Sequence, residues 1–162
     1  MRVSIEYASH MPVLIKALNL TTGPILELGI GLFSTPLLHW LCYPEKRELV
    51  SYESAEGWYN YFKRYNSDFH KVILIDNWDH LPMDRRWDVV FIDHNNDRRA
   101  LDSVLFAETA KYVILHDTEP KEEKTYHYVD VYSKFKYRYD FKDASPYTTV
   151  LSNLIDLSDF KI

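Results

Sequence analysis

The stretch that most constrains the fold runs from Ile25 to Leu41, where an apolar segment leads through a glycine turn into a second apolar segment. Gly29 and Gly31 carry no Cβ, so the backbone can turn sharply there and come close to a ligand. Thr35 and Pro36 follow, a pair typical of the N-cap and first turn of a helix. The stretch therefore predicts a strand, a glycine turn and a helix whose N-terminus faces whatever lies over the glycines.

Strand and helix patterns alternate along the rest of the chain. Apolar strands are expected at 25–28, 48–52, 71–75, 88–92 and 112–115, and helices at about 9–19, 35–42, 55–65, 98–109 and 122–133. Runs such as VILI and VVFI are typical of parallel strands covered on both faces. Two late strands, at 135–141 and 147–151, suit an antiparallel hairpin at one edge. The predicted fold is α/β, a Rossmann-like doubly wound sheet of about seven mostly parallel strands with helices on both faces.

Composition sets the broad class of protein. With 162 residues, 46% of them hydrophobic, the chain predicts a single domain spanning 1–162. Its lone Cys42 excludes an intrachain disulfide and a cysteine-rich zinc site. No signal peptide and no apolar run of roughly 20 residues is visible, so we expect a cytoplasmic protein outside the membrane. The net charge of −5 argues against a nucleic-acid partner.

Acidic residues stand at or near the ends of the predicted parallel strands. Because these ends share one edge of a parallel sheet, five carboxylates are expected along one crevice: Glu27, Glu53, Asp76, Asp93 and Asp117. Any one of them could equally be a helix cap or a loop charge. Together they would repel one another without partners, so they predict a ligand with amine and hydroxyl donors, or a metal ion.

Glu53 is the most informative of these acids. An acidic side chain that ends the second strand can accept hydrogen bonds from both hydroxyls of a ribose, as in dinucleotide sites. Asp76 and Trp78 follow the third strand, where they could meet the amine and the face of an adenine. Trp78 could equally belong to the core.

The motif ELGIG followed by STP, the acid after strand two, FIDH after strand four and HDT after strand five resemble class I S-adenosylmethionine-dependent methyltransferases. More narrowly, they are similar to small bacterial O-methyltransferase-like proteins, over about residues 9–153. The resemblance implies methyl transfer from S-adenosylmethionine, to an oxygen of an acceptor that the motifs do not identify. A small-molecule acceptor, a partner protein and a homo-oligomer all stay open.

The resemblance also implies roles for particular residues. Glu27, Gly29 and Gly31 would hold the methionine part of the cofactor, with Glu27 reading its ammonium directly or through water. Ser34 would touch the carboxylate region, and Glu53 would hold the ribose.

The remaining cofactor contacts and the catalytic groups follow the later strands. Asp76 and Trp78 would frame the adenine, and Asp93 and His94 would border the methyl group and the acceptor. An oxygen acceptor must lose a proton, and His94 and His116 are the imidazoles expected at the crevice. Either histidine could instead be structural. The neighbouring pair Arg98–Arg99 could bind an acidic acceptor, but we expect it on a solvated face.

Metal-dependent O-methyltransferases bind a divalent cation such as Mg²⁺ through acids that match Asp93 and Asp117. That family usually has an amide ligand where this chain has Thr118, and the wider superfamily often has a third glycine where this chain has Phe33. These departures leave open a catalytically silent binding or assembly module. A nicotinamide-dependent enzyme is a further alternative, although its GxGxxG motif needs glycine where Ser34 stands.

Overall fold

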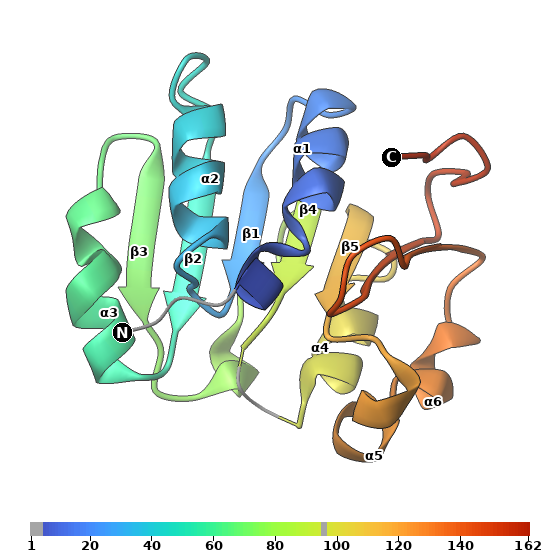
Figure 1. The fold of residues 1–162 in the computed structure, drawn as a ribbon. Helices are drawn as coiled ribbons and strands as arrows, with labels where there is room; N and C mark the ends of the chain where they lie inside the picture. The colour runs from blue at the N-terminus through green and yellow to red at the C-terminus, as the bar shows by residue number, and fades with distance from the viewer. Residues whose placement is uncertain (1–4, 95–96) are drawn as a thin grey trace.

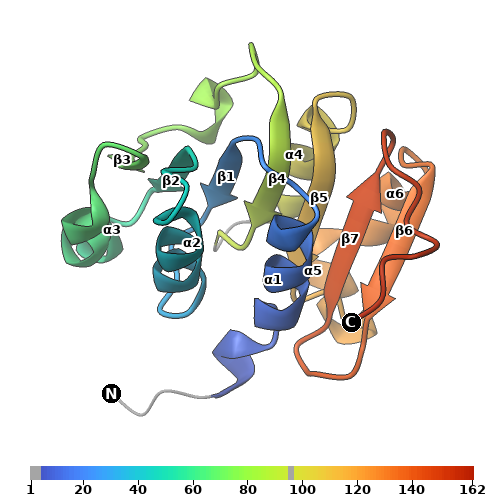
Figure 2. The same ribbon diagram turned by 90° about the horizontal axis from the view of Figure 1, so that it is seen from above.

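A computed structural model describes residues 5–94 and 97–162, and a seven-stranded sheet forms the centre of this part of the chain (Figures 1 and 2). The strand order is β3-β2-β1-β4-β5-β7-β6. The strands are β1 (Ile25–Leu28), β2 (Leu49–Glu53), β3 (His70–Leu74), β4 (Trp87–Ile92), β5 (Ala110–His116), β6 (Tyr137–Phe141) and β7 (Thr148–Ser152). Strands β1 to β5 pair in parallel, whereas β7 is antiparallel to both β5 and β6. The predicted α/β sheet with an antiparallel edge is confirmed.

Helices cover both faces of the sheet. They are α1 (Met11–Asn19), α2 (Ser34–Cys42), α3 (Glu56–Phe62), α4 (Arg99–Leu105), α5 (Glu123–Tyr126) and α6 (Tyr128–Tyr132). Figures 1 and 2 show α1 and α2 on one face and α4, α5 and α6 on the other, with α3 beside β2 and β3. Short 3₁₀ turns lie at Ile5–Ala8, Lys63–Tyr65, Trp78–His80 and Pro120–Glu122. No helix of the described residues is long and apolar enough to cross a membrane.

The central strands are mostly apolar because each of their faces is buried in a separate core. Leu26 and Leu28 pack with Val90 on one side of the sheet, and Ile25 packs with Val89 on the other. The edge strand β3 is different, since its residues Ile73 and Leu74 are exposed although the run is apolar. A continuous apolar run predicted the strand but not its place at an edge.

Two local predictions were wrong in detail. The region 122–133 is not one helix, because His127 adopts a left-handed backbone (φ 56°) that separates α5 from α6. The helix α2 begins at Ser34 with Phe33 as its N-cap, so Thr35 is not the cap. The Thr35 hydroxyl instead donates a hydrogen bond to the Glu27 carboxylate, at 2.9 Å. The predicted cap residue therefore ties the helix start to the tip of β1.

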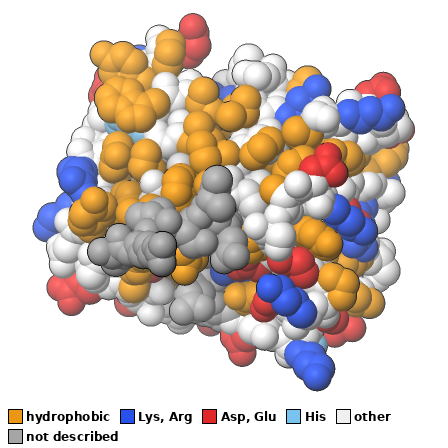
Figure 3. All heavy atoms as spheres, in the orientation of Figure 1, with side chains coloured by type: hydrophobic (Ala, Val, Ile, Leu, Met, Phe, Trp, Pro, Cys, Tyr) orange, Lys and Arg blue, Asp and Glu red, His pale blue; other side chains and the backbone are white. Residues whose placement is uncertain are grey.

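The face formed by α1 and α2 carries many hydrophobic side chains (Figure 3). Exposed examples on these helices are Ile15, Trp40 and Leu41. Scattered apolar residues are normal on a protein surface, so this face alone identifies no partner.

Candidate functional site

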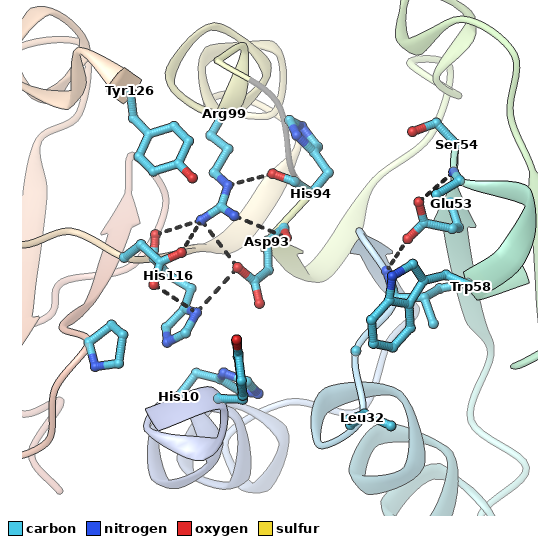
Figure 4. Close-up of a pocket in the computed structure, with 16 residues that line it drawn as sticks. His10, Leu32, Glu53, Ser54, Trp58, Asp93, His94, Arg99, His116 and Tyr126 are labelled. Atoms are coloured by element: carbon cyan, nitrogen blue, oxygen red, sulfur yellow. Dashed lines mark hydrogen bonds and ion pairs between the residues drawn. The ribbon is translucent and has the colours of Figure 1, made fainter. Parts of the chain in front are cut away.

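A cavity of about 760 Å³ lies at the carboxyl ends of the parallel strands, between the glycine turn and the segment after β5 (Figure 4). Residues predicted for the site that line it are Gly31, Glu53, Asp93, His94, His116 and Asp117. They come from the ends of β1, β2, β4 and β5, where parallel strands bring their tips to one edge. Glu27, Gly29, Ser34, Asp76 and Trp78 do not line it.

Glu27 lies beneath the glycine turn, fully buried. Its carboxylate accepts hydrogen bonds from the Thr35 hydroxyl at 2.9 Å and the Ser51 hydroxyl at 2.5 Å. Burial raises the pKa of Glu27 to about 7, against the opposing effect of these hydroxyls. The structure thus gives Glu27 contacts within the protein, below the cavity wall.

The two glycines of the turn meet different constraints. Gly29 has a φ of +92°, and a Cβ there would clash with the backbone of His94. Gly29 is therefore needed for the close approach of the β1 and β4 tips. Gly31 does line the cavity, and a Cβ on it would stand 2.8 Å from Oγ of Ser34. The buried Ser34 hydroxyl has no hydrogen-bond partner among the described residues.

Glu53 joins the end of β2 to the glycine turn. One carboxylate oxygen accepts the Ile30 N–H at 3.1 Å, and the other accepts the Ala55 N–H at 2.7 Å. These bonds fix the carboxylate at the cavity wall, beside the indole of Trp58 (Figure 4). Each oxygen keeps capacity for a further hydrogen bond from a ligand.

Arg99 is the centre of the site, and its expected place on a solvated face was wrong. It is 4% exposed and begins α4 with its side chain turned into the cavity wall. The guanidinium lies 2.8 Å from the Asp117 carboxylate and 3.1 Å from the Asp93 carboxylate. Its Nε donates to the carbonyl of His94 at 2.6 Å (Figure 4). Arg99 thus ties together the segments after β4 and β5.

This arrangement does not fit a divalent cation held by Asp93 and Asp117. The guanidinium of Arg99 bridges the two carboxylates and supplies the positive charge there. Both acids therefore have a partner within the chain, and the expected pair of metal ligands is instead an Arg-centred ion-pair cluster.

His116 does face the cavity. Its Nδ1 is 3.2 Å from Asp93 Oδ1, and its Nε2 is 2.9 Å from the hydroxyl of Ser9. Burial acts to lower the pKa of His116, but the hydrogen bond and charge of Asp93 outweigh it, so the net shift is upward. Burial also acts to raise the pKa of Asp93, but His116 and Arg99 together lower it.

The imidazole of His94, by contrast, is turned away from the cavity. Its Nε2 is 2.9 Å from the buried carboxylate of Asp102, and its ring packs on Trp78 at 4.4 Å between centroids. Trp78 is itself buried, so its ring packs in the core. Asp76 is exposed and lies 3.4 Å from His80. These placements differ from the expected catalytic role of His94 and adenine frame of Asp76 and Trp78.

Besides Arg99, the cavity is lined by His10 and Trp58, for which the sequence predicted no role in the site, and by Tyr126, which could line an acceptor pocket but was expected to pack in the core or on the surface. His10 is the N-cap of α1, Trp58 lies on α3, and Tyr126 ends α5 with its ring centroid 4.4 Å from the Arg99 guanidinium. Burial, with a contribution from His116, lowers the pKa of His10 to about 3, so its ring is neutral. No local motif marks these residues, since only the folded sheet brings them to one edge.

No protein-family model and no curated protein matches the sequence. Solved structures do match. An O-methyltransferase from Bacillus cereus in complex with SAH is 14% identical, with a TM-score of 0.66 over 93% of this chain and 82% of that one. Cofactor-bound Rv0187 from MTB is 15% identical, with a TM-score of 0.70 over 94% and 82%. The N-terminal domain of human METTL16 with SAH is 11% identical, with a TM-score of 0.68 over 94% and 72%.

These matches define the class of fold. The chain has the fold of class I S-adenosylmethionine-dependent methyltransferases, as the resemblance of its motifs implied. At such low identity the likeness concerns the fold, and the activity has to be argued from the site.

Proposed function

We propose that this protein binds S-adenosylmethionine and transfers its methyl group to an oxygen of an acceptor. The observation that carries the proposal is the position of Glu53, held at the cavity wall beside Gly31 at the tips of β2 and β1. An acid at this place suits the two hydroxyls of a ribose. Structural neighbours with this fold include an O-methyltransferase in complex with SAH and the METTL16 domain with SAH.

The rest of the cavity suits the other parts of the cofactor. Gly31 lets a ligand carboxylate come close to the N-terminus of α2, although the Gly31 N–H itself donates to the Thr35 hydroxyl at 3.1 Å. The unpartnered hydroxyl of Ser34 lies beside Gly31. Trp58 is 40% exposed and turns its ring toward the Glu53 side of the cavity, where it can stack on the adenine (Figure 4). In this arrangement Trp58 takes the role expected of Trp78.

S-adenosylmethionine supplies an already activated methyl group, so the protein has to align the acceptor and manage its proton. Asp93 and His116 form a hydrogen-bonded pair on the cavity wall opposite Glu53 (Figure 4). When neutral, His116 can accept the proton of an acceptor hydroxyl, and Asp93 then stabilises the imidazolium. Arg99 holds Asp93 and Asp117 in place through its ion pairs.

The acceptor itself is not identified by these residues. We propose a small molecule, because the cavity of about 760 Å³ is of the size that small-ligand sites have. A protein acceptor is the alternative. Whichever acceptor binds, a second copy of the chain in a homo-oligomer could cover the cavity. We further propose a cytoplasmic location, in keeping with a chain that has one cysteine.

Replacing Glu53 by alanine is expected to weaken S-adenosylmethionine binding by about 1–3 kcal/mol, because a charged hydrogen-bond acceptor is lost. Isothermal titration calorimetry measures the change. Glu56→Ala is the matched control, since Glu56 lies three residues on, is exposed and does not line the cavity. Wild-type affinity in Glu53→Ala contradicts the ribose role.

The same titrations separate the functional alternatives. Binding of S-adenosylmethionine and S-adenosylhomocysteine, but not NAD⁺, supports the methyltransferase proposal. Binding of NAD⁺ alone would identify a nicotinamide-dependent protein. Absence of binding for all three would favour a silent binding or assembly module.

A further inference from the structure

His10 has an unusual environment that the proposed methyl transfer does not explain. It is 2% exposed and lines the cavity, yet neither ring nitrogen has a hydrogen-bond partner among the described residues. Its neighbours are the rings of Phe91 and His116, at 4.9 and 4.7 Å between centroids. Unpartnered buried nitrogens cost stability, so His10 points to a ligand that uses them.

Two further donor groups lie beside His10. One donor atom from each of His10, Asp93 and His116 can be chosen so that all three lie within 4.8 Å of one another. They come from the N-cap of α1 and from the ends of β4 and β5, and their side chains lie close together on the side of the cavity opposite Glu53 (Figure 4). Bonds of about 2.1 Å place the donors of one ion about 3–4 Å apart. A small inward movement of these side chains would therefore bring them to bonding distance.

The surrounding contacts suit His116 and Asp93 as ligands. The hydroxyl of Ser9 lies 2.9 Å from Nε2 of His116. When that hydroxyl accepts a hydrogen bond from Nε2–H, Nδ1 carries no proton and its lone pair points toward Asp93. Outer contacts commonly fix the tautomer of a metal-bound histidine in this way. Asp93 meets both His116 and Arg99 through Oδ1, which leaves Oδ2 for another partner.

We propose that His10, Asp93 and His116 bind a divalent transition-metal ion. Two imidazoles and one carboxylate favour ions such as Zn²⁺, Mn²⁺, Fe²⁺ or Co²⁺ over Mg²⁺, which prefers oxygen ligands. This site differs from the expected pair Asp93 and Asp117, where Arg99 supplies the positive charge. Three protein ligands leave further positions open toward the cavity, as in catalytic rather than structural metal sites.

The role of the ion rests on the proposed function. With the ion bound, His116 is a ligand and no longer the proton acceptor of the proposed function. An acceptor oxygen at an open position would then lose its proton to solvent more readily, and it would be held beside the transferable methyl group. The acceptor class that fits is an alcohol, phenol or other oxygen ligand of the metal. Binding of the ion itself needs no cofactor, so the two proposals can be tested apart.

The test is a titration of the full chain with Co²⁺, after treatment with a chelator and without S-adenosylmethionine. Calorimetry gives affinity, and visible absorption reports the ligand field. We expect one Co²⁺ per chain with a Kd of about 10 μM or below. His10→Phe keeps the ring contacts but removes both nitrogens, so it is expected to weaken binding at least about 100-fold.

Two control variants separate this site from others. Asp117→Asn alters the acid of the expected metal pair, which is only an outer contact of His116 and Arg99 in the proposed site, so it is expected to weaken binding by no more than about tenfold. His80→Ala removes an exposed histidine outside the cavity and is expected to leave binding unchanged. Urea unfolding without metal checks the fold, and His10→Phe is expected to be at least as stable as the wild type because it removes unpartnered nitrogens.

The outcomes distinguish the two proposals. No Co²⁺ binding up to about 1 mM overturns the metal site, as does equal binding by the wild type and a folded His10→Phe. Loss of binding in Asp117→Asn but not in His10→Phe would instead place the ion at the acidic pair. A separate titration of chelated protein with S-adenosylmethionine tests the proposed function, so either proposal can fail alone.

Discussion

Replacing Arg99 by methionine is expected to lower the free energy of unfolding by about 3–5 kcal/mol near neutral pH, because removing one partner leaves buried charges uncompensated. The guanidinium lies 2.8 Å from Asp117 and 3.1 Å from Asp93, and it also donates to the backbone carbonyl of His94. Methionine preserves much of the apolar stem, so the loss reports the charged contacts.

The effect is expected to depend on pH in a defined direction. In the wild type, His116 and Arg99 oppose the effect of burial and keep the pKa of Asp93 below its usual value. That carboxylate therefore adds stability above its unfolded-state pKa, which is lost as the pH falls through the folded-state value. In Arg99→Met this contribution is reduced. The difference in free energy of unfolding between the variant and the wild type is therefore expected to become smaller as the pH falls.

Urea unfolding at several pH values measures both effects. Arg85→Met is the control, because Arg85 forms a bidentate pair with Glu48 that is partly exposed. Its loss is expected to cost no more than about 1 kcal/mol. If Arg99→Met is as mild as this control, or if its deficit stays constant with pH, Arg99 does not hold the site together as described.

The parts of the site that the sequence predicted are those fixed by backbone geometry. Parallel strands place their carboxyl ends at one edge, so the patterns around Gly31, Glu53 and Asp93 were enough to bring these residues to one cavity. The antiparallel edge formed by β6 and β7 was predicted from two late strand patterns that have no long helix between them. These features could be predicted from local sequence patterns because they depend on where the strands end and not on the direction of the side chains.

Side-chain direction was not predictable in the same way. His94 follows a strand tip as expected. Its ring turns inward, however, because it contacts the Asp102 carboxylate on α4 and packs on the Trp78 ring, which lies before β4. Arg99 is drawn inward by carboxylates from two separate strands. The break at His127 is equally hidden, because no glycine marks the left-handed backbone there. Such features depend on partners that a reading of single segments does not bring together.

A series of buried hydrogen bonds behind the glycine turn underlies a second large expected effect, on the stability of a Glu27 variant. The Glu27 carboxylate accepts from the Ser51 hydroxyl, which lies 2.9 Å from Nε2 of His70, and Nδ1 of His70 lies 3.0 Å from Nδ1 of His39. Burial lowers the pKa of both histidines, to about 3 for His70, so these hydrogen-bonded residues bring no positive charge to Glu27. The carboxylate is therefore held by neutral donors alone, which is why burial dominates its pKa.

Replacing Glu27 by glutamine is expected to raise the free energy of unfolding by about 2 kcal/mol near pH 8. Burial raises the pKa of Glu27 from 4.5 to about 7. Between these values the folded chain binds a proton that the unfolded chain does not, so wild-type stability falls as the pH rises through this window. Glutamine has no charge to desolvate, and the Thr35 and Ser51 hydroxyls can turn to accept from its amide.

Urea unfolding from about pH 4.5 to pH 8 tests this pH dependence. The two proteins are expected to differ little at the acidic end, and the advantage of Glu27→Gln should grow toward pH 8. Glu56→Gln is the control, because Glu56 is exposed and its change should leave the pH profile unaltered. Parallel profiles for Glu27→Gln and the wild type would show that Glu27 ionises normally in the fold. A growing difference would show instead that the protein keeps a destabilising carboxylate beneath its glycine turn, as expected for a functional rather than a structural residue.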